Sequence, residues 1–580
     1  MEKMLTCKEA ADLWNFTERW VSIMCKEGKI PGAVKQGHKW MIPADTQKPV
    51  DSRIKTGAYR KEGGPSNLPL PAGVSDYRKA CTEYYYVDKT LFIKEFLDQK
   101  PPVSLFVRPR RFGKTLIMDM LRTFFENTGE DTSRYFQNRK IWSCGESYRR
   151  HQGMYPVIYL TFKDIKFDTW GKSLRKFGDI LQYEYSRHSV LAASDKLSGY
   201  EKNLYSTIVS GKADEIQIAS SLFNLCRMLH AHYGTAPVLL IDDYDTPLIQ
   251  SRAYDYYDPL IFFLQNLFSG TFKDNPHLSF GILSGTHKFP SENIFRDYVA
   301  PRVFSFTDYS FREAFGFTQD EIVQMAAYSG LTVDIDELAE WYGGYSVGDE
   351  VIMNPWSVVS CLANGGQIQP YWAAGGAAEI LRPMFRSSAY GSMEHLRALF
   401  AGKAITTQVD LESPDPENPQ TLAEVYGLLV HEGYLHVIGQ TIRPNGVILH
   451  SLEFPNKEVS IICRKELLSY LKDEQIIAPA PALLLQDAIY NHNAPRFQQA
   501  LKQLLYQSIR SNKEPGEAYY QSLFTGLMLL SEEAYSIVEA PAAPDNYELQ
   551  LIPLNDEGMP EVKIEIKAGK TVKLLYSKQV

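Results

Sequence analysis

RPRRFGKT, residues 108–115, is the stretch of sequence that decides the fold class of this chain. It lies between an apolar run, Val103–Val107, and a run with a helical pattern, Leu116–Asn127. A strand that turns through Gly-Lys-Thr into a helix offers phosphates a row of backbone N–H groups and the positive end of the helix. Lys114 is then expected to reach the β- and γ-phosphates of a nucleotide, and the Thr115 hydroxyl to hold Mg²⁺.

The alternative is a basic surface turn before a helix, because the usual pattern G-x-x-x-x-G-K-[ST] has glycine where this chain has Arg108. If the loop binds phosphates, the residues expected to contact the nucleotide are Arg110, Arg111, Phe112, Gly113, Lys114 and Thr115.

A second apolar run, PVLLIDDYD at residues 237–245, ends in acidic residues and reads as a buried parallel strand. Acids at the carboxyl end of such a strand lie at the crevice where α/β sheets bind ligands. Asp242 is expected to hold Mg²⁺ through water, and Asp243 to polarise the water that attacks the phosphate. An ordinary strand followed by a solvated acidic turn is the alternative, which the phosphate-loop pattern upstream disfavours.

The remaining strands of this core are expected from apolar runs of similar length. One of them ends in small polar residues, so Thr286 is expected to contact the γ-phosphate or the attacking water, with a simple turn residue as the alternative. Arg110, Arg111 and Arg296 are candidates to neutralise charge on the leaving phosphate. The five expected strands are Val103–Val107, Pro156–Phe162, Val238–Asp242, Leu278–Ser284 and Val303–Phe306.

Composition is that of an ordinary soluble protein with several domains. The chain has 580 residues, too many for one hydrophobic core, with 44% hydrophobic and 22% charged residues. It has no run of 18 apolar residues and no signal-peptide core near its start, so we expect a cytoplasmic protein without a membrane span. Seven cysteines without a C-x-x-C pair predict reduced thiols and no zinc site. The net charge of −8 means that any nucleic-acid contact must come from local patches.

The C-terminal segment contains a second possible catalytic site. Strands are expected at Tyr547–Pro553 and Val562–Lys567, after an apolar helix that Glu517 opens. Glu565 and Lys567 share one face of the second strand because side chains alternate with period two. On that face Glu565 can bind Mg²⁺, while Lys567 positions the attacking water or steadies the charged phosphate.

Two further acids are expected to complete that metal shell: Glu517 from the helix, and Glu548, or else Asp545, from the preceding strand. The alternative is a charged, solvated strand face, since E-x-K often occurs by chance.

The first 49 residues read as two short helices followed by a hairpin. The first helix is expected over Cys7–Leu13, with Thr6 as N-cap and Glu9 three residues later, and the second over Thr17–Cys25. Residues 30–43 then fold back about Gln36-Gly37-His38. Residues 50–75 are rich in Gly, Pro and Ser, and we expect a flexible linker there.

Six segments resemble the AAA-ATPase-like family of prokaryotic proteins, in order from about residue 76 to the end. This resemblance implies a P-loop NTPase that uses ATP and Mg²⁺, with a PD-(D/E)XK nuclease-like domain at the C-terminus. Arginine at the position of Arg108 is usual in that family. Asp243 stands where the family has Glu, and its shorter side chain is expected to slow hydrolysis. The segments are YYVDKT (85–90), RPRRFGKT (108–115), LLIDDYDTP (239–247), FGFT (315–318), WYGGY (341–345) and NPWS (354–357).

The C-terminal pattern is similar to the PD-(D/E)XK nucleases, with two departures. The strand acid, normally Asp, is Glu548, and Gln521 stands where the family often has His. We therefore expect a preserved fold with weak or absent cleavage.

Residues 1–49 resemble the winged helix-turn-helix of excisionase-like and MerR-like DNA-binding domains, through G-K-I-P-G-A (28–33) and W-M-I-P (40–43). This resemblance implies that the second helix enters the major groove and that the wing touches the backbone. A protein-binding module is the alternative. The expected DNA contacts are Arg19 and Ser22 to bases, and Lys26, Lys35, His38 and Lys39 to phosphates.

The whole chain is thus expected to be a multidomain α/β protein. Two classes of function remain open: an ATP-driven, DNA-associated enzyme, and a nucleotide-gated regulator whose nuclease-like fold only docks nucleic acid or a protein. ATP and DNA are the expected partners, and a homo-oligomer is one option. The expected parts are a winged helix-turn-helix at 1–49, a linker at 50–75, the ATPase domain at 76–308, a helical lid-like region at 309–400, a connecting α/β region at 401–490 and a nuclease-like domain at 491–580.

Overall fold

The computed structural model describes residues 4–14, 21–22, 25–26, 30–36, 39–44, 46, 68–289, 294–295, 301–306, 308–345, 351–372, 381, 392–411, 419, 421–511, 517–531, 534–540, 546–554, 558–567 and 571–576. The chain forms two compact units, Met1–Ser66 and Asn67–Val580.

The first unit contains a three-stranded antiparallel sheet in the order β1-β3-β2. Its strands are β1 (Met4–Thr6), β2 (Val34–Gln36) and β3 (Lys39–Pro43). Helix α1 (Cys7–Trp14) starts with the predicted cap: Glu9 N donates to Thr6 Oγ1 at 3.3 Å, and Thr6 N donates to Glu9 Oε2 at 2.8 Å. The predicted hairpin is present as β2 and β3. Residues 21–22 and 25–26 are helical, and small apolar side chains fill the core of this unit.

The second unit contains a parallel sheet in the order β5-β6-β7-β4-β8. All four pairings are parallel, which confirms the α/β class and the five expected strands, with ends shifted by one or two residues. Strand β7 lies between β4 and β6, so these two strands are not neighbours. Their carboxyl ends, which lead into RPRRFGKT and carry Asp242, still lie at the same end of the parallel sheet. The strands are β4 (Val103–Val107), β5 (Val157–Thr161), β6 (Val238–Asp242), β7 (Phe280–Gly285) and β8 (Arg302–Phe304).

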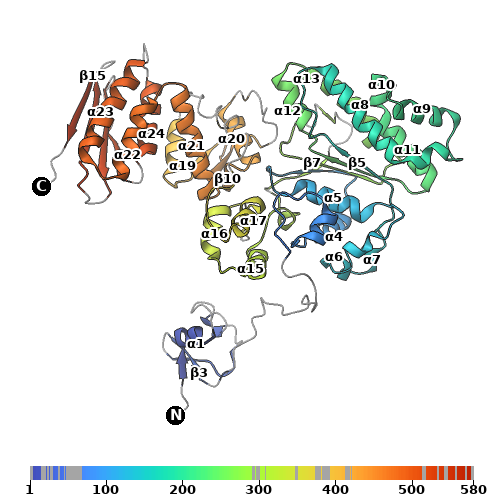
Figure 1. Ribbon diagram of the computed structural model, residues 1–580, viewed down its shortest axis with the longest axis horizontal. Coiled ribbons are helices and arrows are strands. Elements are labelled where there is room, and N and C mark those ends of the chain that lie inside the picture. The colour runs from blue at the N-terminus through green and yellow to red at the C-terminus, as the bar shows by residue number, and fades with distance from the viewer. Residues whose placement is uncertain are drawn as a thin grey trace. The chain divides into compact units, whose positions relative to one another are not determined.

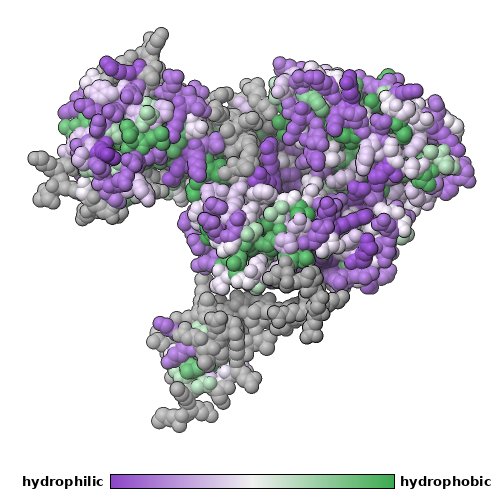
Figure 2. All heavy atoms as spheres, in the orientation of Figure 1, coloured by the Kyte–Doolittle hydropathy of each residue, from purple (hydrophilic) through white to green (hydrophobic). Residues whose placement is uncertain are grey.

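Two helical layers cover this sheet, as Figure 1 shows. Alternate side chains of each strand point to opposite faces of the sheet, so Leu105 packs in the hydrophobic cluster of one layer and Phe106 in that of the other. The Phe106 layer contains α3 (Tyr77–Glu83), α4 (Leu91–Gln99), α5 (Lys114–Phe125), α6 (Lys140–Ser143) and α7 (Glu146–Arg149). The Leu105 layer contains α8 (Trp170–Arg187), α9 (Gly199–Val209), α10 (Glu215–Ala219), α11 (Ser221–Tyr233), α12 (Thr246–Ala253) and α13 (Tyr257–Phe272). The outward side of this second layer is largely hydrophilic (Figure 2).

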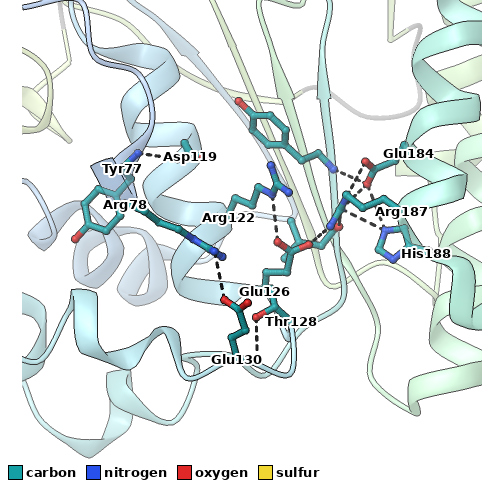
Figure 3. A network of polar contacts seen from close by, with 12 residues as sticks. Tyr77, Arg78, Asp119, Arg122, Glu126, Thr128, Glu130, Glu184, Arg187 and His188 are labelled. Atoms are coloured by element: carbon teal, nitrogen blue, oxygen red, sulfur yellow. Dashed lines mark hydrogen bonds and ion pairs between the residues drawn. The ribbon is translucent and has the colours of Figure 1, made fainter. Parts of the chain in front are cut away.

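A buried ionic network joins the two layers at the amino ends of the strands (Figure 3). Arg187 at the end of α8 lies 2.6 Å from Glu184 and also pairs with Glu126, just after α5. Arg122 pairs with the same Glu126 at 3.2 Å, and His188 lies 3.3 Å from Glu184. Because Glu184 and Glu126 are both nearly inaccessible to water, their charges depend on these partners.

Within the expected lid-like region, three of the described helices pack around their own hydrophobic cluster: α15 (Gln319–Tyr328), α16 (Ile335–Tyr342) and α17 (Pro355–Ala363). Lys89 ties α15 to the core around the parallel sheet, because its ammonium group donates to Glu321 at 2.6 Å and to the Glu313 carbonyl at 2.7 Å.

The remaining elements share one large hydrophobic cluster that runs from Trp372 to Ile566. The boundary expected at residue 490 therefore falls inside a continuous core. Its sheets are β10-β11-β9 and β12-β13-β14-β15. The elements are α19 (Ser392–Phe400), β9 (Ile405–Thr407), α20 (Leu422–His431), β10 (His436–Ile442), β11 (Ile448–Glu453), α21 (Lys457–Asp473), α22 (Pro479–Tyr490), α23 (Ala494–Ser511), α24 (Glu517–Ser531), β12 (Tyr535–Ala540), β13 (Asn546–Pro553), β14 (Val562–Lys567) and β15 (Thr571–Tyr576). Among the described residues, no helix has the length and apolar character needed to cross a membrane.

Candidate nucleotide-binding site

The loop after β4 has the strand–loop–helix form that the sequence predicts. Gly113 is the N-cap of α5 with φ +81°, a conformation that favours glycine, and a Cβ at this position would meet no atom within 4 Å. The space beside Gly113 therefore opens directly onto the amino end of a helix, where backbone N–H groups attract anions.

Lys114 lies folded against its own loop. Its ammonium group donates to the carbonyls of Arg108 at 2.8 Å and Pro109 at 3.0 Å, and to Thr286 Oγ1 at 3.2 Å. Burial lowers the pKa of Lys114, while Asp243, Asp245 and Asp242 act in the opposite direction. A phosphate that entered this site would offer the buried cation stronger acceptors than neutral carbonyls.

The acids after β6 lie beside this lysine. Asp242 is fully buried, and its Oδ1 accepts a hydrogen bond from Ser284 on β7, whereas its Oδ2 has no partner among the described residues. Asp243 adopts φ +52°, and burial followed by the charge of Asp242 raises the pKa of Asp243 to about 6. The buried, unshared oxygen of Asp242 fits a role toward a cation with its water shell.

The loop after β7 is held by Asp245. The Oδ2 atom of Asp245 accepts hydrogen bonds from Thr286 N at 2.7 Å and His287 N at 2.8 Å. Tyr244 adds another contact, because its hydroxyl donates to the His287 carbonyl at 2.8 Å. Thr286 is thereby fixed with its hydroxyl facing Lys114.

These groups surround a pocket of about 630 Å³ at the carboxyl edge of the sheet. Arg110, Arg111, Gly113, Lys114, Thr115, Asp243 and Thr286 line it, so most of the expected nucleotide contacts meet in one place. Thr115 and Asp243 line the pocket, Asp242 lies buried next to Asp243 with one oxygen unpartnered among the described residues, and open space lies beside Gly113; this donor set fits a nucleotide with Mg²⁺.

The side chains of Phe112 and Arg108 point away from the pocket, and that of Arg111 packs on an aromatic ring in the pocket wall. Phe112 is buried against Tyr345 and Phe306, so only its backbone is available to a nucleotide. The Arg111 guanidinium lies 4.2 Å from the Trp356 ring centroid. Arg108 is fully buried and donates to the carbonyls of Val107 at 2.8 Å and Phe304 at 2.7 Å.

Arg108 therefore ties β4 to β8, which explains how an arginine replaces the first glycine of the usual pattern. Arg296, the third arginine considered, lies outside the described residues.

Sequence reasoning missed several residues of the pocket. Lys163 and Lys166 line it from the loop after β5, and their place after a parallel strand was an available signal. Residues 71–75, which we expected in the linker, also line the pocket, and their Pro- and Gly-rich composition concealed this. Trp356 of the lid-like region covers another side; it lies in the NPWS segment, which carries the family resemblance but does not itself indicate a contact with the pocket.

The predicted C-terminal acids are brought together in part. Glu548 on β13 lies directly opposite Glu565 on β14, so the expected shared face exists. Lys563 occupies the space between them, 2.5 Å from Glu548 and 3.4 Å from Glu565. Lys567 is exposed at the end of the same strand.

Glu517 begins α24, but its side chain and all of Asp545 lie outside the described residues. Within the part of the chain that the structure describes, no group of three or more His, Cys, Asp or Glu side chains is placed to hold a metal.

The expected DNA contacts are described only in part. Lys26 and Lys35 are exposed, and Ser22 is half-buried on the second helical segment. Arg19, His38 and the side chain of Lys39 lie outside the described residues.

Comparisons with known proteins agree with the location of the pocket. Residues 71–295 match the family model described as Predicted AAA-ATPase. A relative described as an uncharacterized protein in the vnfD 5'region of Azotobacter chroococcum mcd 1 is 26% identical over 410 residues, which are 70% of this chain and 70% of the relative. The matched segment begins at the edge of the pocket and includes the loop, the acids and Thr286, so nucleotide binding is the activity to which both the geometry and the family similarity point.

Proposed function

We propose that this protein binds ATP with Mg²⁺ at the loop 108–115 and hydrolyses it at the carboxyl edge of its parallel sheet. One observation carries this proposal: Lys114, Thr115, Asp243 and Thr286, from three separate strand ends, line a single pocket of about 630 Å³. The strand–loop–helix turn by itself would also be consistent with an ordinary surface turn. A surface turn does not explain why Asp243 and Asp245 line the same pocket as Lys114.

In this proposal Lys114 exchanges the carbonyls of Arg108 and Pro109 for oxygens of the β- and γ-phosphates. Thr115 and Asp242 would hold Mg²⁺, which neutralises charge on the phosphate oxygens when it is bound. Asp243 accepts a hydrogen bond from the attacking water, and Thr286 steadies that water or the γ-phosphate. The water oxygen bonds to the γ-phosphorus as the bond to the β–γ bridging oxygen breaks, which leaves ADP and phosphate.

The experiment is calorimetric titration with ATP and Mg²⁺, together with a phosphate-release assay, on the full-length protein and its Lys114→Ala variant. Lys114 would make charge-assisted contacts with two phosphates, each contributing roughly 1.5 kcal/mol or more, so ATP affinity should fall at least about 100-fold. Lys212→Ala, on an exposed turn, is the matched control. Equal affinity in the Lys114→Ala and control proteins would refute the site.

A second candidate function is DNA binding by the first unit, supported by the exposed Lys26 and Lys35 and the observed β2–β3 hairpin. In this proposal the second helix contacts bases, and Lys35 on the hairpin contacts phosphate. The cations lie on a small unit, so binding by it alone would be modest.

For the C-terminal sheet we propose that it docks nucleic acid or a protein rather than cleaving nucleic acid. Lys563 already forms ion pairs with both Glu548 and Glu565, and a divalent cation would have to displace it. If cleavage does occur, Glu565→Ala and Lys567→Ala should each abolish plasmid nicking in Mg²⁺ or Mn²⁺ while ATP turnover continues. Nicking that survives Glu565→Ala would point to another centre.

A further inference from the structure

The carboxyl end of α20 reaches the nucleotide site from a part of the chain far beyond the matched segment 71–295. Its C-cap residue, Glu432, is only 2% exposed. One oxygen of Glu432 lies 2.8 Å from His287 Nε2, and the other lies 3.9 Å from Arg110 Nε in the phosphate loop. The Glu432 side chain thus contacts Arg110, which lines the pocket, and His287, which follows the lining residue Thr286.

His287 connects Glu432 to the loop that carries Thr286. The other ring nitrogen of His287, Nδ1, lies 3.3 Å from Asp245 Oδ2. That same oxygen accepts the backbone N–H groups of Thr286 and His287, and the Thr286 hydroxyl accepts from Lys114. A continuous series of polar contacts therefore runs from α20 through the ring to the residue expected beside the γ-phosphate.

The charges in this series are mutually dependent. Burial alone would lower the pKa of His287, but Glu432 and Asp245 outweigh it and raise the pKa to about 9. Burial would likewise raise the pKa of Glu432, and His287 holds it below the usual value. The other titratable groups nearby are Arg110, Lys114, Lys288 and His431. Burial, followed by the charge of His287, lowers the pKa of His431 to about 4, so the His431 ring is neutral at physiological pH.

The same end of α20 also packs against the phosphate loop. Gly433, with φ +81°, approaches so closely that a Cβ would lie 2.9 Å from Pro109 Cγ. Trp372 donates its indole N–H to the Arg110 carbonyl at 3.4 Å, and its ring lies 5.0 Å from that of Tyr434. The backbone of the loop and the Thr286 loop are therefore both supported by one short segment.

We propose that Glu432 is a positioning residue for ATP hydrolysis, supplied to the P-loop site by α20 through His287 and Asp245. It does not line the pocket, so it acts by fixing where Thr286 and Arg110 lie rather than by touching ATP. This inference rests on the proposed function. One consequence is that a displacement of α20 would disturb hydrolysis. By the same coupling, nucleotide binding would alter the position of α20 and of the C-terminal hydrophobic core to which it belongs.

The test compares Glu432→Gln with Glu424→Gln, a matched change near the start of the same helix, in steady-state ATP turnover by the full-length protein. We expect Glu432→Gln to lower kcat by about 10- to 100-fold, because a small misplacement near the reacting groups has that effect. The KM and the affinity for ATP should stay within about threefold, since Gly113, Lys114 and Thr115 are unchanged. The control should match the wild type.

The pH profile gives a readout that a merely structural role would not move. With Glu432 neutral, His287 loses one of its two carboxylates and deprotonates at lower pH, so the alkaline fall of kcat should begin at lower pH than in the wild type. Gly433→Ala, which pushes the helix end from Pro109 but keeps Glu432, should also lower kcat.

Retained ATP affinity in calorimetry shows that each variant is folded. An unchanged kcat and alkaline limb in Glu432→Gln would overturn the inference, as would a loss confined to ATP affinity. Absence of turnover in the wild type would instead refute the proposed function.

Discussion

The Asp245–His287–Glu432 arrangement predicts a specific dependence of stability on pH. The perturbation is His287→Gln, which keeps a hydrogen-bonding side chain of similar size but cannot carry a positive charge. The pKa of His287 rises from 6.5 to about 9 on folding, against the opposing effect of burial. At about 1.4 kcal/mol for each tenfold change in proton affinity, the protonated ring stabilises the folded state by about 3 kcal/mol.

The sign of this contribution follows from the direction of the pKa change. A group whose pKa is raised on folding stabilises the protein fully below its unfolded pKa, and that stabilisation is lost as pH rises through the folded value. The contribution of His287 should therefore be complete near pH 6, decline between pH 6.5 and 9, and be almost absent above pH 9.5.

The assay is thermal unfolding of the wild type and His287→Gln, followed by circular dichroism at several pH values. Because both proteins share every other titrating group, the difference between their melting temperatures isolates His287. For a unit as long as Asn67–Val580, an unfolding entropy of about 2.1 cal/mol/K per residue makes 3 kcal/mol correspond to about 3 °C, so we expect a difference of that order at pH 6 and almost none at pH 9.5. Parallel pH curves for the two proteins would show that His287 is not held as a cation between the two carboxylates.

Three other outcomes are expected. Asp243→Asn should leave ATP bound but stop turnover, and Asp242→Asn should weaken the dependence of ATP turnover on Mg²⁺. Phosphate release by Asp243→Asn at the wild-type rate would show that another residue positions the attacking water. Glu184→Gln should lower the free energy of unfolding by roughly 3 kcal/mol at neutral pH, because His188 and Arg187 overcome burial and lower the pKa of Glu184 to about 2. Its ATP affinity should be unchanged in calorimetry, since the network of Figure 3 lies at the amino ends of the strands, away from the pocket. Removal of residues 1–49 should weaken DNA binding without altering ATP affinity, and wild-type binding should weaken by about one log unit per log of salt for each phosphate contact; salt-insensitive binding in a fluorescence titration would favour protein docking.

The local chemistry of the nucleotide site is readable from the sequence because its signals lie within single segments. Val103–Val107 and Val238–Asp242 are apolar over the length of a buried strand, and parallel strands bring their carboxyl ends to one edge. The Gly-Lys-Thr turn at the start of an amphipathic run likewise predicts where α5 begins. These patterns are sufficient for the sheet, the phosphate loop and the positions of Asp242 and Asp243.

Other parts of the site depend on contacts between distant segments, and no local pattern encodes them. Residues 71–75 and Trp356 meet at the pocket only because the start of the second unit and α17 are folded around the same edge of the sheet.

Glu432 is such a residue. In the sequence it is a single acid after an apolar helix, and neither periodicity nor a motif indicates that it lies near the nucleotide site. The tertiary structure alone gives it a role, because burial beside His287 removes water and makes each of these charges depend on the other. Periodicity and motifs report which surface an element buries, whereas the identity of its neighbour is decided only when the whole chain packs.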